Sequence, residues 1–231
     1  MLRVAAYNVR SLRDDRAALL RVIRAVRPDV LCLQEVPRFA GWRWRRRALA
    51  RDAGMAVAAG GRVGGVAVLA GPAVRVLHGR GHRLRWYSGL EWRGAALAVV
   101  GKDGARYAVC SIHLDLVAGA RLRHAVQVTA ILEGAARTFG ARAVLAGDVN
   151  EEPGGPVWRH LAGRYTDCFA AAPEGDGRTF PAGDPRARID AIFAGPGLHV
   201  LRCGGADVSP RDLAAASDHL PVVADLALPG G

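Results

Sequence analysis

Polar side chains with catalytic potential stand at or beside the ends of several apolar runs in this 231-residue chain. Asn8 follows the run 2–7, and Glu35 follows the run 30–33 after one glutamine. Short apolar runs predict β-strands, and strand ends lie at the rim of a sheet, where functional groups are usually built. We therefore expect four acids, two asparagines and two histidines to converge on one cleft. They are Asn8, Glu35, His113, Asp148, Asn150, Asp190, Asp218 and His219.

Four carboxylates in one cleft need a counter-charge, because like charges raise one another's pKa and cost free energy. Carboxylate, amide and water oxygens suit a hard divalent cation, so we expect Mg²⁺ or Mn²⁺. Taken singly, each residue has another interpretation, since Asp and Asn favour turns and a lone histidine is commonly structural. Residues 147–150 could form a turn, and the pair 218–219 could end a helix. The ordered occurrence of six such sites favours a catalytic cleft.

Short elements separated by glycine and proline must position these side chains. Leu19, Ile23 and Val26 recur at helical spacing, which predicts a helix that begins near Ser11 and ends before Pro28. No linker-like stretch or repeat interrupts the chain. We therefore expect one domain over residues 1–231, an α/β fold with two packed sheets and helices outside them. Further helices are predicted over 43–53 and 118–139, and strands over 2–7, 30–33, 65–69, 73–77, 95–100, 107–112, 143–146, 189–193, 198–201 and 222–226.

Six short motifs stand in a fixed order along the chain: 7–10 (YNVR), 33–36 (LQEV), 112–114 (IHL), 147–150 (GDVN), 188–190 (RID) and 217–219 (SDH). With this set the chain resembles the endonuclease/exonuclease/phosphatase superfamily, which includes the deoxyribonuclease-like metal-dependent phosphoesterases. The resemblance spans nearly the whole chain. It implies a four-layered α/β sandwich, in which two mixed or mostly antiparallel sheets carry helices on both outer faces. It also implies Mg²⁺-dependent cleavage of a phosphoester.

The resemblance implies that Glu35 is the principal metal ligand, with Asn8 and Asp218 nearby, bound directly or through water. One departure concerns this part of the site. Abasic-site endonucleases carry an acid two residues after the first asparagine, whereas this chain has Arg10. The departure removes the side chain that a second acidic ligand at this position would need.

The resemblance also implies the catalytic roles. Asp148 orients and deprotonates the attacking water, and Asn150 holds that water or the phosphoryl group. His219 contacts the phosphoryl oxygens, and Asp190 orients the His219 ring. His113 assists the leaving group or the phosphate; abasic-site endonucleases have tyrosine there, so the deoxyribonuclease-like and phosphatase-like branches are closer. These roles match what phosphoester hydrolysis requires: an activated nucleophile, neutralised phosphoryl charge and help for the leaving group.

Two arginines beside these motifs are candidates for substrate binding. Arg93, with Glu91, resembles a strand-edge Glu-x-Arg of many family members, and a cross-strand ion pair is the alternative. Arg188 opens the motif that contains Asp190. Residues 42–47 (WRWRRR) interleave rings with guanidinium groups, which is typical of nucleic-acid binding, although a helix with its tryptophans packed inward is the alternative. The connections look short, and no exposed apolar hairpin is evident.

Composition narrows the class of protein. Hydrophobic residues make up 51% of the chain and charged residues 23%, which excludes wholesale disorder. The net charge of +11 is almost entirely arginine, since Lys102 is the single lysine, and it would attract polyanions. No apolar run is long enough to span a membrane, and the start lacks a secretory pattern, so we expect a cytoplasmic monomer. We expect reduced thiols at the four widely spaced cysteines, Cys32, Cys110, Cys168 and Cys203.

Three functions agree with these features. The first is metal-dependent hydrolysis of a phosphodiester in DNA or RNA by in-line attack of water. The second is a phosphatase or phosphodiesterase for a small phosphorylated metabolite or a lipid head group. The third is a nucleic-acid-binding module without activity, which the basic charge favours and the complete set of catalytic residues disfavours.

Overall fold

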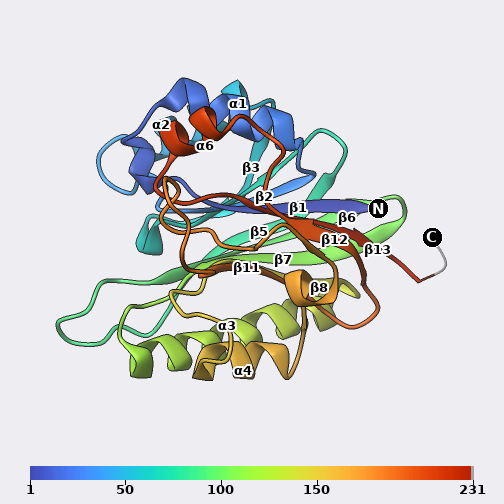
Figure 1. Ribbon diagram of the computed structural model, residues 1–231. Helices are drawn as coiled ribbons and strands as arrows, with labels where there is room; N and C mark the ends of the chain where they lie inside the picture. Colours follow the sequence, from blue (N-terminus) through green and yellow to red (C-terminus); the bar gives the residue numbers. More distant parts are fainter. Residues whose placement is uncertain (230–231) are drawn as a thin grey trace.

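Two β-sheets pack face to face in the computed structural model, which describes residues 1–229 (Figure 1). The first sheet has the order β10 (Pro173–Glu174), β12 (His199–Gly204), β13 (Val222–Ala227), β1 (Leu2–Asn8), β2 (Val30–Gln34), β4 (Ala67–Ala70), β3 (Ala56–Gly60). The second has the order β5 (Arg75–Arg83), β6 (Gly94–Lys102), β7 (Ala105–His113), β8 (Arg142–Asp148), β11 (Asp190–Ala194), β9 (Thr166–Asp167). Both sheets contain parallel and antiparallel pairs.

Helices cover the outer face of each sheet, which gives the expected four layers (Figure 1). On the first sheet lie α1 (Arg16–Val26), α2 (Trp42–Asp52) and α6 (Pro210–Ala216), and on the second lie α3 (Ala118–Phe139) and α4 (Pro156–Ala162). The remaining helical segments are the short α5 (Cys168–Ala171) and the 3₁₀ turns η1 (Arg10–Leu12) and η2 (Val63–Gly65). The predicted α/β sandwich is confirmed. Among the described residues, no helix has the length and hydropathy that crossing a bilayer requires.

Strand β1 shows why the central strands are apolar on both faces. Val4 and Ala6 point into the core between the sheets, whereas Ala5 and Tyr7 point into the core beneath the helices. All four side chains are at most 1% exposed. A strand between two layers needs apolar residues at every position, because its alternating side chains meet a core on either side. The run therefore stops only where the strand reaches the edge of the sandwich.

The first helix begins later than the sequence predicted. Asp15 caps α1 by accepting hydrogen bonds at its Oδ1 from the backbone nitrogens of Ala17 and Ala18, at 2.8 and 3.1 Å. Ser11 instead lies in η1, where three consecutive non-glycine residues have positive φ angles of 41°, 58° and 57°. That conformation cannot open a right-handed helix. The boundaries of α3, by contrast, are those predicted, and Gly140 ends the helix with a left-handed cap.

A further expectation, that the chain lacks an exposed apolar hairpin, was wrong. Strands β5 and β6 pair antiparallel up to Arg83 and Gly94, and the ten residues between them form a projecting connection. Its Trp86 and Trp92 stack at a centroid distance of 5.5 Å and remain 44% and 49% exposed. The sequence gives only a weak signal here, because serine, glycine and glutamate interrupt the apolar residues of the segment and arginines flank the aromatic ones.

Candidate active site

Five strand ends carry Asn8, Glu35, His113, Asp148 and Asp190 to one edge of the sandwich. Strands β1 and β2 run parallel, as do β7 and β8, so the carboxyl ends of these pairs emerge together. Strand β11 runs antiparallel to β8 and begins at this edge. In this register His113 lies opposite Asp148, and Asp148 lies opposite Asp190. Three chemically active residues are thus neighbours on adjacent strands.

A buried hydrogen-bonded link holds the two sheets together beneath this edge. Gln34 Nε2 donates to Ser111 Oγ at 3.0 Å, and Ser111 Oγ donates to the Leu33 carbonyl at 3.0 Å. Gln34 and Ser111 are both 0% exposed. Buried polar side chains of this kind are costly unless they are bonded to each other, so the pairing specifies how β2 sits against β7. It fixes the separation of the carboxylates that follow.

Asn8 joins two carboxylates from different sheets. Its Nδ2 donates to Glu35 Oε1 at 3.2 Å and to Asp148 Oδ2 at 3.1 Å, while its Oδ1 accepts the backbone N–H of Arg10 at 3.1 Å. Asn8 is 1% exposed. A neutral amide is suited to this position because it bonds two anions without adding charge. Asn8 therefore fixes the positions of the Glu35 and Asp148 carboxylates relative to each other.

His219 and Asp190 form a buried pair. The distance from His219 Nδ1 to Asp190 Oδ2 is 2.8 Å, and both residues are at most 6% exposed. Burial lowers the pKa of His219, but the charge and hydrogen bond of Asp190 outweigh it and raise the pKa to about 9. The Phe180 ring, 4.8 Å from the imidazole centroid, packs against it. The pair therefore presents a protonated imidazole in one orientation.

Asp148 stands between two histidines of different protonation. Its Oδ2 lies 3.5 Å from His113 Nε2 and 3.9 Å from His219 Nε2. Burial and then the nearby Asp190 charge raise the pKa of Asp148 above its usual range. Burial, with help from the Arg93 charge, lowers the pKa of His113 well below its usual value, so this imidazole is neutral. The arrangement brings together a basic carboxylate, a neutral imidazole and a charged one.

Backbone geometry holds two further site residues. Asn150 donates its backbone N–H to Asp148 Oδ1 at 2.9 Å and its Nδ2 to the Leu114 carbonyl at 3.1 Å. Asn150 has a φ of 53°, which asparagine tolerates, and Glu35 has a φ of 51°, which is costly for a longer side chain. Strained residues of this kind persist where surrounding contacts over-determine them, and they cluster at functional sites.

A cavity of about 220 Å³ opens beside the buried carboxylates and is lined by Glu35, His113 and Arg93 among others. Arg93 is 6% exposed, and its guanidinium lies 3.7 Å from Asp115 and 3.5 Å from Glu91. Both the ion pair and the position on the cavity are thus present at Arg93. The structure therefore agrees both with an ion pair and with a position from which Arg93 could contact substrate.

The donor set suits a divalent cation at Glu35. Within the described 229 residues, no arginine, lysine or histidine nitrogen lies within 4.0 Å of its carboxylate, although the chain carries a net charge of +11. An unpaired carboxylate on an open cavity is free to ligate a hard cation. Asp148, Asp190 and His219 form a second set whose ligand atoms lie within 4.8 Å of one another. Those three residues are buried, and each already makes a hydrogen bond within the site.

Two expected site residues make other contacts. Asp218 is about one-third exposed and pairs with Arg10, with 3.2 Å between Arg10 Nε and Asp218 Oδ2. Arg188 donates through both terminal nitrogens to Asp167, at 3.0 and 2.8 Å, and its guanidinium lies 4.6 Å from the Trp158 ring centroid. The charge of Arg188 is therefore already neutralised within the chain.

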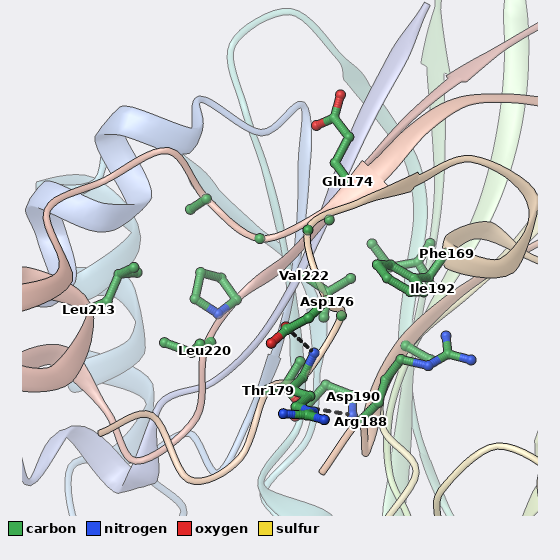
Figure 2. A pocket seen from close by; sticks show the side chains of 18 residues that line it. Phe169, Glu174, Asp176, Thr179, Arg188, Asp190, Ile192, Leu213, Leu220 and Val222 are labelled. Carbon is green, nitrogen blue, oxygen red and sulfur yellow. Dashed lines mark hydrogen bonds between the residues drawn. The ribbon is translucent and has the colours of Figure 1, made fainter. Parts of the chain in front are cut away.

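Arg188 borders a second cavity, of about 190 Å³ (Figure 2). Leu213 and Leu220 lie toward one side of this cavity, and Phe169 and Ile192 toward the other. Asp190 also lines it, and the Asp190 Oδ1 atom has no hydrogen-bond partner. The cavity is apolar in its walls and polar where it reaches the site.

The comparisons with known proteins agree with this geometry. A model of the endonuclease/exonuclease/phosphatase family matches residues 5–219. The chain belongs to this family. Members of the family are divalent-metal-dependent hydrolases of phosphate esters, and this chain is a phosphoesterase of the same kind. Curated proteins give no match.

Several solved structures share the fold of this phosphoesterase. An endonuclease/exonuclease/phosphatase from Bacteroides vulgatus has a TM-score of 0.80 at 21% identity, over 98% of both chains. A mannosyl-6-phosphatase from Bacteroides thetaiotaomicron has a TM-score of 0.80 at 20% identity, over 99% of this chain and 100% of the other. The human Nocturnin catalytic domain with a bound sulfate anion has a TM-score of 0.77 at 19% identity, over 98% and 94%. Identities this low establish likeness of fold alone.

Some residues of this phosphoesterase site were not found from the sequence. Asp115, 3% exposed, supports Arg93 and accepts the Val117 N–H at 2.9 Å. Thr179 Oγ1 accepts the Asp190 N–H at 3.3 Å from a connecting loop. The His-x-Asp spacing of 113–115 is a usable signal for Asp115. Thr179 has no local signal, because its role depends on where a loop crosses the sheet edge.

Proposed function

We propose that this phosphoesterase hydrolyses a phosphodiester of nucleic acid with Mg²⁺ or Mn²⁺ and a water nucleophile. The observation that carries the proposal is the unbroken series of contacts from Glu35 through Asn8 to Asp148, with the His219–Asp190 pair beside it. The net charge of +11 favours a polyanionic substrate, since it attracts phosphate chains at long range.

Glu35 is the residue we assign to the metal. Among the described residues its carboxylate accepts a hydrogen bond from Asn8 but has no cationic partner, and it borders the open cavity, whereas Asp148 and Asp190 lie beside protonated His219. Asn8 directs its amide nitrogen at the carboxylates, so we assign it to hold them. Asp218, which is partly exposed beside Arg10, completes the assignment through water. When bound, the cation neutralises charge that develops on the phosphoryl and departing oxygens.

Asp148 is the general base of the proposal. Its pKa is raised by burial and by Asp190, and a base is most efficient when its pKa approaches the working pH. The Asn150 backbone N–H bonds Asp148 Oδ1, and Oδ2 accepts one bond from Asn8, so we assign the remaining lone pair of Oδ2, which lies toward the two histidines, as the proton acceptor. Asn150 holds the water or a phosphoryl oxygen through its side chain once substrate replaces its bond to the Leu114 carbonyl.

His219 stabilises negative charge on the phosphoryl group. Its Nδ1 is committed to Asp190, so Nε2–H is the donor that faces substrate. A protonated imidazole forms a charge-assisted hydrogen bond with an anionic oxygen. His113, held neutral, and Arg93 lie on the same cavity and bind the phosphate or the leaving oxygen. Arg188 is not kept in the proposed substrate site, because Asp167 already binds its guanidinium.

A substrate panel tests the proposal. The purified protein is assayed with Mg²⁺ or Mn²⁺ on single-stranded DNA, double-stranded DNA, RNA and a small phosphodiester. We expect cleavage of nucleic acid that EDTA abolishes and that Asp148→Asn lowers by about 10²–10⁴-fold. Cleavage that survives either change would contradict the proposal. Salt-dependent binding without cleavage would support the inactive binding module instead.

A small phosphorylated metabolite is the second candidate substrate. The mannosyl-6-phosphatase that shares the fold over 99% of this chain supports a sugar phosphate as such a substrate. Phosphate release from sugar phosphates or lipid head groups, with polymers left intact, would favour this alternative.

A further inference from the structure

A surface hollow, distinct from the cavity at Arg188, adjoins the Glu35 cavity. This outer hollow has a volume of about 280 Å³ and shares Ser11, Arg13, Arg38 and Phe39 with the Glu35 cavity. Arg45 of α2 also lines it. The two hollows are therefore adjacent, with four lining residues in common. A substrate longer than one phosphoester group would therefore pass from the reacting centre into the outer hollow.

The outer hollow carries positive charge that the chain leaves uncompensated. Among residues 1–229, no carboxylate lies within 4.0 Å of a side-chain nitrogen of Arg13 or Arg45, and both arginines are exposed. Arg38 is the exception, since it pairs with Glu91. Guanidinium groups gathered without acids suit an anionic ligand, and phosphate is the anion that they bind best by geometry.

An exposed aromatic ring stands between the two hollows. Phe39 is 72% exposed, although phenylalanine is usually buried. The Arg38 guanidinium lies 5.4 Å from its ring centroid, and the high exposure leaves most of the ring open to solvent. A ring held next to arginines offers a stacking surface for a planar base.

A strained turn builds the wall of both hollows. Arg10, Ser11 and Leu12 all adopt the left-handed region, which is unfavourable for non-glycine residues. The Ser11 N–H donates to the Glu35 carbonyl at 2.7 Å, and the Arg10 N–H donates to Asn8 Oδ1 at 3.1 Å. The turn therefore ties Arg13 to the two residues at the metal end of the site. Such strain is kept where a precise position matters.

We infer that the outer hollow binds the single-stranded nucleic-acid segment next to the scissile phosphate. A base stacks on Phe39, and the neighbouring phosphates bind Arg13 and Arg45. A single strand fits because a base must leave its own stack to reach an aromatic side chain. The inference rests on the proposed function for the reacting phosphate, and it adds the polymer, its strandedness and the residues that bind it.

Fluorescence anisotropy with EDTA-treated protein tests the inference without cleavage. The probes are a labelled ten-residue oligothymidylate and an abasic oligomer of equal length and charge. We expect the wild type to prefer the thymidylate by about tenfold, and Phe39→Ala to erase that preference. We expect Arg45→Gln to weaken both probes and to reduce the slope of log Kd against log salt by about one.

Helix α2 supplies matched controls. Trp44 is also 72% exposed, and Arg47 is exposed on the same helix, but neither lines the outer hollow. Trp44→Ala and Arg47→Gln should leave both Kd values within about twofold of the wild type. Equal binding of the two probes by the wild type, or equal losses in the control variants, would overturn the inference. If the protein cleaved DNA but gave those binding results, the proposed function would stand and the inference about the outer hollow would fail. If it bound the thymidylate in preference to the abasic probe but cleaved no nucleic acid, the inference would stand and the proposed function would fail.

Discussion

Asp190 lies directly opposite Asp148 across the antiparallel pair of β11 and β8, and its Oδ2 is 2.8 Å from His219 Nδ1. Carboxylates on facing residues of adjacent strands repel, and the charge of Asp190 raises the pKa of Asp148. His219 resolves the conflict because its protonated ring lies between them, with Nε2 3.9 Å from Asp148 Oδ2. Asp190 thus favours the protonated form of His219, which agrees with the proposed role of Asp148 as the general base.

Asp190→Asn should lower kcat by about 10²–10⁴-fold with little change in KM, because the His219 ring loses its orienting acceptor. The pH profile gives a sharper signature. Activity that needs protonated His219 is lost as pH rises through its pKa, which Asp190 raises to about 9. Without Asp190 the alkaline limb should move to lower pH. Steady-state kinetics across pH, with circular dichroism to confirm folding, measure both effects, and an unmoved limb would contradict the assignment.

Glu35→Gln should raise the Mn²⁺ concentration required for half-maximal activity by about tenfold or more, because a neutral amide is a poorer ligand than a carboxylate. Asp190→Asn is the comparison, since Asp190 belongs to the other acidic set within 4.8 Å. It should leave the metal requirement nearly unchanged. Calorimetric titration of Mn²⁺ into both variants measures affinity apart from activity. If Asp190→Asn weakened Mn²⁺ binding more than Glu35→Gln did, the metal site would be assigned to Asp148, Asp190 and His219 instead.

The meeting of the site residues at one edge was predictable from the sequence, because most of them stand at the beginning or end of a strand that is apolar on both faces. A polar residue such as Asn8 or Asp148 that follows such a run lies at the edge of the sheet, because both faces of the strand are covered by apolar cores. The parallel and antiparallel registers then bring these ends together. The length of α3 was also predictable, since Gly140 supplies its left-handed cap.

Other features depend on tertiary contacts that no local pattern encodes. Ser11 has the residue type of a helix cap, but its N–H bonds the Glu35 carbonyl, and Asp15 caps α1 instead. Strand β3 and helices α4 and α6 were not predicted, because the alanine and glycine around them fit several structures. Arg188 was predicted to bind substrate, but the sequence does not reveal that its guanidinium is bonded to Asp167.

Gly147→Ala should destabilise the protein by about 2–4 kcal/mol and lower Tm by roughly 5–15 °C. Gly147 precedes Asp148 and has a φ of 144°, and a Cβ there would lie 2.1 Å from the Ile112 carbonyl oxygen. Relief of that clash moves β8 against β7, so kcat should also fall by about tenfold or more.

Gly119→Ala is the control for that substitution. Gly119 is exposed within α3, and a Cβ there meets no atom within 4 Å, so the change should stabilise the chain by up to about 1 kcal/mol. Thermal denaturation of both variants, with assays on the soluble fraction, gives the comparison. A Tm for Gly147→Ala equal to that of the wild type would show that the strands accommodate the methyl group.

Asp225 should make stability depend on acid pH. Its carboxylate, 5% exposed, binds Arg3 through Nε at 2.8 Å and Nη2 at 2.9 Å, and Arg202 through Nε at 2.7 Å. The hydrogen bond from Arg3, and that from Arg202, lower the pKa of Asp225 below its usual value. A lowered folded-state pKa stabilises the protein above the unfolded value, near 3.9, and that stabilisation is lost as pH falls through the folded-state pKa.

Asp225→Asn should therefore cost about 2 kcal/mol at pH 7, because two arginines lose a charged acceptor that is nearly buried. The difference between wild type and variant should begin to shrink as pH falls below about 4, where the unfolded wild type takes up a proton, and should vanish below the lowered folded-state pKa. Urea denaturation from pH 3 to pH 7 measures it. Asp184→Asn is a suitable control, since Asp184 pairs with Arg186 on the surface, with both side chains well exposed, and should change stability by less than about 0.5 kcal/mol at any pH. A difference that stayed constant from pH 7 to pH 3 would mean that the ionic contacts of Asp225 do not contribute.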